Sequence, residues 1–284
     1  MKGYNMDTDT LIRLALEEDI GPGDHTSLST ISAGATRRVH LLIKEQGILA
    51  GIPVAEKVFA RVDPDIRMNV LITDGTRVNT GDIAFTAEGK AISLLMSERV
   101  LLNFMQRLSG IATYTRLMAD RIGDLPARIM DTRKTTPLLR ELEKYAVRVG
   151  GGLNHRFGLY DMILIKDNHV DFAGGISKAI TRAREYLEVH PLDLKIEIEV
   201  RNQTELNEVL NEGGVDRIML DNFHPAELRK AVEKIGKRYE TEASGGITLE
   251  NVREYAETGV DFISVGALTH HIRSLDMSLK AIKP

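Results

Sequence analysis

Cysteine is absent from this sequence of 284 residues. Without a thiol, the chain can form no disulfide, no cysteine metal site and no thiolate nucleophile. No stretch approaches the roughly 18–20 apolar residues that a membrane span needs, and the first ten residues lack the apolar segment of a signal peptide. These absences predict a protein that binds no membrane and works in a reducing compartment, the cytoplasm.

Strong compositional bias is missing as well. Apolar residues make up 43% of the chain and charged residues 27%, which is typical of a globular protein and excludes disordered and collagen-like classes. The length allows two domains, or one large α/β barrel with an appendage. A net charge of −4 argues against a general surface for nucleic acid.

Positive charge is concentrated in one segment of this acidic chain. Between Pro126 and Arg156, seven basic residues stand against three acidic ones, so the segment has a net charge of +4. Such a segment indicates a local site for a small anion. Arg140, Lys144 and Arg148 are at helical spacing, and we interpret these three as a solvated helix face.

The chain before residue 125 has the pattern of an α+β module. Residues 10–18 predict a short amphipathic helix and residues 39–43 a strand, with two glycine turns further on. The strands of this module need not be parallel. Residues 91–121 predict a long helix, and its apolar stripe consists of Leu94, Leu101, Met105 and Leu108.

After residue 125, six short apolar runs alternate with amphipathic helices. The runs are ARIMDTRK, DMILIKDN, LKIEIEV, DRIMLDN, YETEASGG and DFISVGA. This alternation predicts parallel strands with right-handed crossovers, in a doubly wound sheet or a (β/α) barrel. Polar side chains or glycines end the runs, as at the mouth of a barrel, whereas a doubly wound sheet gathers its site at one switch point. We therefore expect a barrel, partly open because six strands are fewer than eight.

Two glycine loops, Ser244-Gly245-Gly246 and Gly266-Ala267, follow the last two runs. Glycine lets backbone N–H groups approach an anion, and the last two loops of barrel enzymes often bind phosphate. Thr248 is expected to cap a following helix whose N-terminus would favour the same anion. The alternative is that the Gly-Gly pair only makes a turn.

Carboxylates end two neighbouring runs, at Glu199 and Asp221. Glu197 shares a face with Glu199 through the two-residue period of a strand, so both are expected to point into the barrel. A carboxylate buried there needs a cation or hydroxyl groups, such as Mg²⁺ or a ribose. The alternative is a structural ion pair with Lys134, Lys166 or Lys195.

Lys166 follows four apolar residues at the end of its run. It is a Schiff-base nucleophile, a fixed cation for an acid group, or a surface lysine, and these alternatives stay open from the residues alone. His155 and Arg156 follow Gly150-Gly151-Gly152, a flexible stretch that could close over a ligand. None of the eight histidines has the spacing of a zinc site, and those at 169, 270 and 271 stay unassigned.

Long strings of the second part resemble one known family. DTRKTTP, EKYAVRVGGGLNHRFGLYDMILIKDNH, IEIEV, LDN, SGGI and VGALTHH look like those of quinolinate phosphoribosyltransferases, also called nicotinate-nucleotide pyrophosphorylases, and occur in the same order. SERVLLNFMQRLSGIAT extends the resemblance into the first part. The GGGLNHR…LIKDNH block is specific, whereas SGGI or LDN alone would carry little weight. None of the site positions in these strings departs from the family pattern.

The resemblance implies a subunit of two domains. Residues 1–112, completed by 272–284, would form an N-terminal α/β sandwich, and residues 113–271 a partly open barrel of about six parallel strands with the phosphoribosyltransferase site. It also implies a homodimer, or a larger assembly of dimers, in which the N-terminal domain of one subunit covers the barrel mouth of the other.

The resemblance further implies roles for the residues at the strand ends. The quinolinate pocket would consist of Thr132, Arg133, Lys134, His155, Arg156 and Lys166, with Arg99 entering from the neighbouring subunit. Glu199 and Asp221 would face the ribose and hold Mg²⁺, partly through water and substrate. The phosphate would bind at Ser244, Gly245, Gly246, Gly266, Ala267, Leu268 and His270. The implied catalytic residues are Lys134, Lys166, Glu199 and Asp221.

The implied reaction makes nicotinate mononucleotide, CO₂ and pyrophosphate from quinolinate and phosphoribosyl pyrophosphate. The pyridine nitrogen would attack the anomeric carbon, and the 2-carboxylate would leave afterwards. Arginine forks and lysine point charges suit these anions. Three alternatives are a barrel lyase with Lys166 as its Schiff base, a non-catalytic relative, and a phosphoribosyltransferase for nicotinate or nicotinamide, which would need fewer cations.

Overall fold

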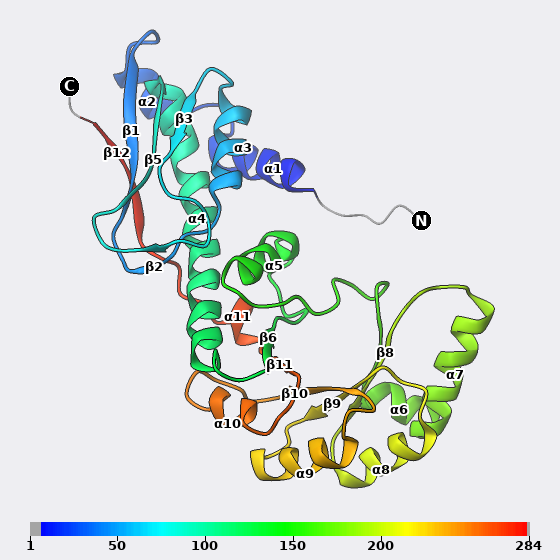
Figure 1. Cartoon of the computed structure of the whole chain (residues 1–284). Coiled ribbons are helices and arrows are strands. Elements are labelled where there is room, and N and C mark those ends of the chain that lie inside the picture. Colours follow the sequence, from blue (N-terminus) through cyan, green and yellow to red (C-terminus); the bar gives the residue numbers. More distant parts are fainter. Residues whose placement is uncertain (1–6, 283–284) are drawn as a thin grey trace. The chain divides into compact units, whose positions relative to one another are not determined.

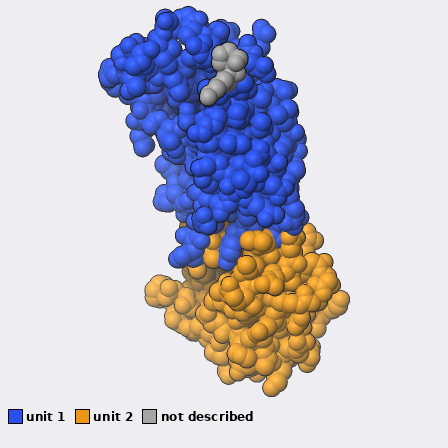
Figure 2. Space-filling view, turned by 90° about the vertical axis from the view of Figure 1, so that its left-hand side faces the viewer, with its two compact units in different colours: residues 1–116, 135–151, 269–284 blue, residues 117–134, 152–268 orange. Residues whose placement is uncertain are grey.

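The computed structural model describes residues 7–282, which divide into two compact units (Figures 1 and 2). Within these residues, unit 1 comprises 7–116, 135–151 and 269–282, and unit 2 comprises 117–134 and 152–268. Unit 1 is therefore assembled from three separate segments of the chain. No helix of the described residues has the length and apolarity needed to cross a bilayer.

An antiparallel sheet of four strands, in the order β12-β1-β5-β3, forms the centre of unit 1. Its strands are β1 (Thr36–Ile43), β3 (Arg67–Val70), β5 (Ile83–Lys90) and β12 (Met277–Ala281), and a separate pair is formed by β2 (Gly47–Ile48) and β4 (Arg77–Val78). Strand β12 pairs with β1, so residues from the two ends of the chain share one sheet. The strands are not parallel, as the sequence allows.

Five helices accompany this sheet in the chain. They are α1 (Thr8–Ile20), α2 (His25–Thr30), α3 (Ile52–Val62), α4 (Ala91–Arg121) and α5 (Arg140–Val149). Helix α4 has the expected bounds. Its predicted apolar stripe is buried, whereas Arg99 is exposed.

The interpretation of three cations on α5 as a solvated face is wrong for Lys144, whose exposure is only 1%. Helix α5 presents an apolar side formed by Leu142, Ala146 and Val147. Lys144 is adjacent in sequence to buried Glu143, and both side chains are enclosed. Helical spacing alone does not separate an enclosed cation from a solvated one.

Unit 2 contains the six predicted strands, all parallel, in the order β6-β11-β10-β9-β8-β7. They are β6 (Arg128–Met130), β7 (Ile163–Ile165), β8 (Ile196–Val200), β9 (Arg217–Asp221), β10 (Glu240–Ser244) and β11 (Phe262–Ser264). Strands β6 and β7, the first two of this unit, lie at opposite edges of the sheet. Every other pair of strands that follow each other in the chain is adjacent in the sheet. This is the order of a (β/α) barrel that is open between its first and second strands, which confirms the predicted fold class.

The helices of unit 2 are α6 (Asp167–Ala173), α7 (Ile176–Val189), α8 (Gln203–Glu212), α9 (Pro225–Ile235) and α10 (Val252–Ala256), and the short α11 (Ala267–His270) follows β11. Helices α7 to α10 of unit 2 follow the strands as predicted, with one correction at the start of α10, whereas the short α6 and α11 are not predicted. Thr248 does not cap α10, whose N-cap is Asn251. The Asn251 side chain instead accepts the Thr248 N–H at 2.7 Å, so a turn separates the glycine loop from the helix.

Candidate active site

The predicted residues of unit 2 gather at one edge of the parallel sheet. The carboxyl ends of parallel strands in register meet at the same edge, and there the chain places functional side chains. These residues are Thr132, Arg133 and Lys134 after β6, Lys166 after β7, Glu199 on β8, Asp221 on β9, Ser244 at the end of β10 with Gly245 and Gly246 after it, and Gly266, Ala267 and Leu268 after β11. Arg99 and His270 belong to unit 1, and both are exposed.

Arg133 and Arg156 are neighbouring cations at this edge. Burial and the positive charge of Arg133 lower the pKa of Arg156. Nε of Arg133 is buried without a hydrogen-bond acceptor, and Arg156 donates from Nη1 to the Met162 carbonyl at 3.2 Å. Two guanidinium groups held together repel each other, so this place favours an anion.

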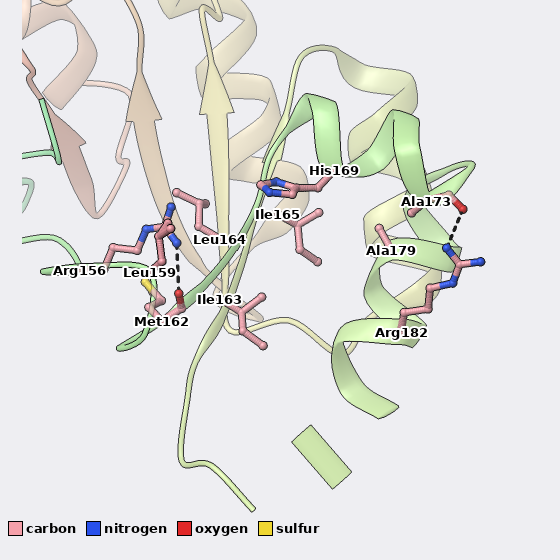
Figure 3. A pocket seen from close by; sticks show the side chains of 10 residues that line it. All are labelled: Arg156, Leu159, Met162, Ile163, Leu164, Ile165, His169, Ala173, Ala179 and Arg182. Atoms are coloured by element: carbon pink, nitrogen blue, oxygen red, sulfur yellow. Dashed lines mark hydrogen bonds between the residues drawn. The ribbon is translucent and has the colours of Figure 1, made fainter. Parts of the chain in front are cut away.

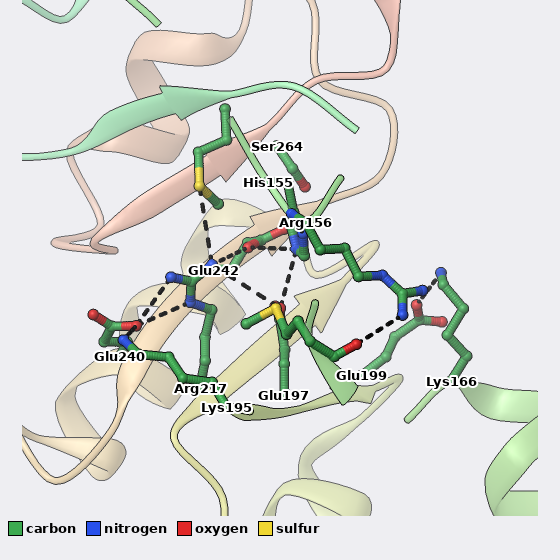
Figure 4. A network of polar contacts seen from close by, with 12 residues as sticks. His155, Arg156, Lys166, Lys195, Glu197, Glu199, Arg217, Glu240, Glu242 and Ser264 are labelled. Carbon is green, nitrogen blue, oxygen red and sulfur yellow. Dashed lines mark hydrogen bonds and ion pairs between the residues drawn. The ribbon is translucent and has the colours of Figure 1, made fainter. Parts of the chain in front are cut away.

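Glu199 and Lys166 form an ion pair across β8 and β7. Lys166 Nζ donates to Glu199 Oε2 at 2.8 Å (Figure 4), and Glu199 is 8% exposed. The sequence analysis offers Glu199 either as a strand-end group for a ligand or as the partner of a lysine. The structure gives Glu199 a lysine partner and places it at a strand end as well. An ammonium group that donates to a carboxylate is a fixed cation.

Asp221 lies beside the glycine loop that follows β10. Asn222 donates from Nδ2 to Asp221 at 2.6 Å and from its backbone N to the Ser244 carbonyl at 2.8 Å. Gly245 has a φ of +94°, and a Cβ there would lie 2.2 Å from the Asn222 side-chain oxygen. Only glycine therefore permits this close approach of the two strand-end loops.

Charged side chains fill the barrel interior beneath these ends (Figure 4). Glu197 and Glu242 are fully buried, and His155 Nε2 lies 3.0 Å and 3.4 Å from their carboxylates. Arg217 Nη1 lies 3.2 Å from Glu242 and 4.0 Å from Glu197, and Arg217 also binds Glu240 at 3.0 Å. Because strand side chains alternate, Glu197 and Glu199 face inward as predicted. The partners of Glu197, however, are His155 and Arg217 and not a lysine.

This cluster holds more protons than the separate groups would. Burial alone would lower the pKa of His155, but hydrogen bonds to Glu197 and Glu242 and their charges raise it to about 9. Burial and the charge of Glu242 raise the pKa of Glu197 to about 7. The carboxylates of Glu197 and Glu242 carry one negative charge more than the Arg217 guanidinium neutralises. An additional proton on this cluster removes that excess charge.

A metal at this interior cluster is disfavoured, although His155, Glu197 and Glu242 offer ligand atoms within 4.8 Å of one another. The Arg217 guanidinium already brings positive charge to both carboxylates. A divalent cation there would be repelled at close range in a medium of low dielectric constant. We therefore interpret the cluster as an ion-pair network.

His155 is turned away from the mouth of the barrel. Its Nε2 faces the two interior carboxylates, and its Nδ1 lies 2.7 Å from the backbone N of Arg156. Buried Asp131 accepts the His155 backbone N–H at 2.9 Å and the Asn154 side chain at 2.5 Å. His155 thus holds the segment that carries Arg156.

Comparisons with known proteins agree over the whole chain. Family models match at residues 24–109, "Quinolinate phosphoribosyl transferase, N-terminal domain", and at 111–280, the C-terminal domain of the same family. The chain belongs to the quinolinate phosphoribosyltransferase family. Its activity is the transfer of a phosphoribosyl group to quinolinate with decarboxylation, which makes nicotinate mononucleotide for NAD biosynthesis.

Two curated relatives and one solved structure illustrate the similarity. A quinolinate phosphoribosyltransferase [decarboxylating] 1b of Nicotiana tabacum is 48% identical, over 95% of this chain and 81% of the relative. A probable nicotinate-nucleotide pyrophosphorylase [carboxylating] of Bacillus subtilis is 45% identical, over 92% of this chain and 89% of the relative. The crystal structure of NadC from Streptococcus pyogenes covers 100% of both chains at 38% identity, with a TM-score of 0.92.

One cavity of this quinolinate phosphoribosyltransferase family member lies beside β7, on the open side of the barrel (Figure 3). Its volume is about 440 Å³. Its walls are mainly apolar, from Leu159 and Ile163 to Ala179, and Arg156, His169 and Arg182 also line it. Arg133, Lys134 and Lys166 do not line this cavity, so it does not correspond to the predicted quinolinate pocket.

Asp131, Arg217 and Glu242 are site residues that the sequence analysis does not single out. All three are buried and belong to the network around His155. The signal for Glu242 is present in YETEASGG, where Glu240 and Glu242 alternate as the two glutamates of IEIEV do. No sequence pattern indicates a role for Asp131, because its partners Asn154 and His155 belong to a loop without a regular period.

Proposed function

We propose that this family member binds quinolinate between Arg133 and Arg156 and transfers the phosphoribosyl group at the ends of β8 and β9. The observation that carries the assignment is the pair of adjacent guanidinium groups, one with a buried Nε that lacks an acceptor. A carboxylate supplies acceptors for an arginine fork in bidentate geometry. Lys134 and Thr132, on the same loop, would complete the pocket, and His155 would hold Arg156 in place from below.

Lys166 and Glu199 would act on the two reactants, Lys166 on quinolinate and Glu199 on the ribose. The Lys166 ammonium, fixed by Glu199 at 2.8 Å, would bind a substrate carboxylate and hold the ring with its nitrogen toward the ribose. Glu199 and Asp221 would stabilise the positive charge that develops on the sugar as pyrophosphate leaves. The pyridine nitrogen forms the new bond to the anomeric carbon, and the pyrophosphate oxygen takes the electron pair of the broken one.

Loss of CO₂ would follow the transfer. Before the transfer, the cations around the 2-carboxylate of bound quinolinate would stabilise the carboxylate and so oppose its loss as CO₂. Once the nitrogen carries the ribose, the ring is cationic and stabilises the carbanion that decarboxylation leaves, which then takes up a proton. This order keeps quinolinate intact until it is bound to the sugar.

Glu199 and Asp221 would hold a magnesium ion, Glu199 through the carboxylate oxygen that does not accept from Lys166. Both are carboxylates at adjacent strand ends on one face of the sheet, and Mg²⁺ prefers a few such oxygens together with water and substrate phosphates. When bound, Mg²⁺ would neutralise the pyrophosphate leaving group. Glu199 keeps its Lys166 partner, and Asp221 keeps Asn222.

The phosphate of the sugar would bind at the loops after β10 and β11. Gly245 and Gly246 have positive φ values of 94° and 62°, a conformation that exposes backbone N–H groups. Gly266 precedes the short α11, which begins with Ala267 and Leu268 and ends at His270. After β10, glycine rather than a helix N-terminus would provide the binding surface, because α10 begins only at Val252.

A homodimer and a cytoplasmic location complete the proposal. Exposed Arg99 on α4 is free of the apolar core of its own unit, which suits a cation that enters a partner's pocket. Two curated relatives are named as mitochondrial or chloroplastic, so fractionation of the native host tests the location, and sedimentation tests the dimer.

The direct test is to mix the purified protein with quinolinate, phosphoribosyl pyrophosphate and Mg²⁺ and to measure nicotinate mononucleotide and CO₂ in equal amounts. Parallel reactions with nicotinate and with nicotinamide should give at least about 100-fold lower kcat/KM, because cations are left without a carboxylate. Equal use of nicotinate would contradict the pocket assignment.

A second test separates Lys166 as a cation from Lys166 as a nucleophile. Borohydride added during turnover should leave the enzyme unmodified, because quinolinate has no ketone or aldehyde and Lys166 is held by Glu199. A reduced adduct at Lys166, found by mass spectrometry, would support a Schiff-base reaction instead.

A further inference from the structure

A buried ion pair in unit 1 adjoins two segments that the proposed function uses. Glu143, in the first turn of α5, is fully buried. Its Oε1 accepts hydrogen bonds from Nε and Nη2 of Arg107 on α4, at 2.9 and 2.6 Å. Its Oε2 accepts the backbone N–H of Thr136 at 3.1 Å. One carboxylate thus joins two helices and a loop.

Arg107 reaches beyond its carboxylate partner. Nη2 also donates to the Thr136 hydroxyl at 2.7 Å and to the Thr269 carbonyl at 3.2 Å. Thr136 is two residues after Lys134 in the chain, and Thr269 directly precedes His270. The same guanidinium therefore binds the loop that follows the predicted quinolinate residues and the short α11, which contains predicted phosphate residues.

Stability alone does not account for this arrangement. A buried ion pair costs desolvation energy, and apolar side chains of similar volume often replace such pairs without loss of stability. Arg107 makes its contacts through two nitrogens of one planar fork, which a lysine does not reproduce. An apolar pair would lack the hydrogen bonds to Thr136 and Thr269. These bonds hold the loop that contains Thr136 and the short α11 that contains Thr269.

We propose that Arg107 and Glu143 are positioning residues for the phosphoribosyl transfer. Through Thr136 they set the course of the segment with Arg133 and Lys134, and through Thr269 that of the segment with His270. Neither residue touches substrate. The proposal rests on the proposed function, because it takes those two segments as the substrate-binding ones.

The first experiment compares Arg107→Lys with the parent enzyme under steady-state conditions. Lysine keeps the charge opposite Glu143, so the variant should fold, but one ammonium cannot replace the fork. We expect KM for quinolinate and for phosphoribosyl pyrophosphate to rise about tenfold, with kcat within about threefold, since small displacements of binding groups are costly. A purely structural role would lower the melting temperature and the folded fraction and leave both KM values unchanged.

A double variant and a matched control sharpen the comparison. Arg107→Met with Glu143→Leu removes the pair without leaving a buried charge, and should show the same rise in KM and faster hydrogen exchange at the Thr136 amide. Arg253→Ala breaks an exposed Arg–Asp pair with two bonds of 2.8 Å to Asp124, and should change neither.

The outcomes are distinct. An inactive parent would refute the proposed function itself. An active parent whose Arg107→Lys and double variants keep parental KM values would overturn the positioning role, whatever their stability. Raised KM values in both variants, with parental values for Arg253→Ala, would support it.

Discussion

Arg133 is the side chain on which the proposed acid pocket depends most directly. Arg133→Ala should lower kcat/KM for quinolinate by about 10- to 150-fold, the loss expected for a charge-assisted contact of roughly 1.5–3 kcal/mol. The pKa of Arg156 should rise in this variant, because a repelling charge is gone. Steady-state kinetics provide the measurement, and activity within twofold of the parent would remove Arg133 from the site.

His155 should make the stability of the protein depend on pH. Its folded pKa of about 9 lies above the value of roughly 6.5 for an unfolded chain. Its stabilisation is therefore complete below pH 6.5 and is lost as pH rises through about 9. Protonation at Nδ1 breaks the hydrogen bond from the Arg156 N–H, and the positive charge of Arg217 also disfavours the charged imidazole. The carboxylates of Glu197 and Glu242 at Nε2 favour the charged form and raise the pKa.

The measurement is urea unfolding between pH 6 and 10, for the parent and for His155→Gln. The free energy of unfolding of the parent should fall over this range by an amount on the order of 2 kcal/mol more than that of the variant. His25→Gln, a change at an exposed histidine, should keep the slope of the parent. Equal slopes in all three proteins would show that His155 is neutral in the fold.

Single residues also show where prediction from the sequence ends. The inward direction of Glu197 and Glu199 follows from strand alternation, and the structure confirms it. The partner of Glu197 does not follow, because Arg217 reaches it only through the register of β8 against β9, which places the two residues opposite each other. Register between strands some twenty residues apart depends on packing that no local pattern contains.

At the scale of elements, the loop after β10 makes a sharp prediction. In Gly245→Ala, the new Cβ would overlap Asn222, at 2.2 Å from its side-chain oxygen and 2.9 Å from its backbone N. Asn222 and the adjacent Asp221 must then move, and we expect KM for phosphoribosyl pyrophosphate to rise by about 10- to 100-fold.

Gly246→Ala is the matched control for this loop. Its φ is also positive, but nothing lies within 4 Å of the added atom. The variant should lose about 1 kcal/mol of stability through backbone strain, with a smaller effect on KM. Equal kinetic effects in both variants would mean that strain, and not the Asn222 contact, disturbs the loop.

Elements were predictable where a pattern is long. Helix α4 and all six strands of the barrel follow from periodicity and from their alternation with helices. The sequence predicts the cap of α10 at Thr248, whereas the helix begins at Val252, and the Asn251 side chain accepts the Thr248 N–H in the turn before it. Helices α3 and α6 were not predicted, since glycine-rich or short apolar stretches conceal their period.

At the scale of the whole molecule, the proposed sharing of sites between two subunits predicts complementation. Arg99→Ala and Lys134→Ala homodimers should both be nearly inactive. When the two are mixed equally and re-associated, half of the dimers are mixed, and each mixed dimer has one intact site of two. About a quarter of full activity should return. No recovery, while native mass spectrometry shows mixed dimers, would mean that Arg99 does not serve the partner's site.

The pairing of β12 with β1 has a consequence for the order in which the protein is made. β1 begins at Thr36, and its partner β12 begins at Met277. At a translation rate of roughly 5–20 residues per second, β1 leaves the ribosome about 12 to 50 seconds before β12 exists. During that time one edge of β1 has unpaired backbone groups, which invite association with other chains. The first sheet to emerge is therefore the last to be completed, because β1 stays an edge strand until the barrel and then β12 have been made.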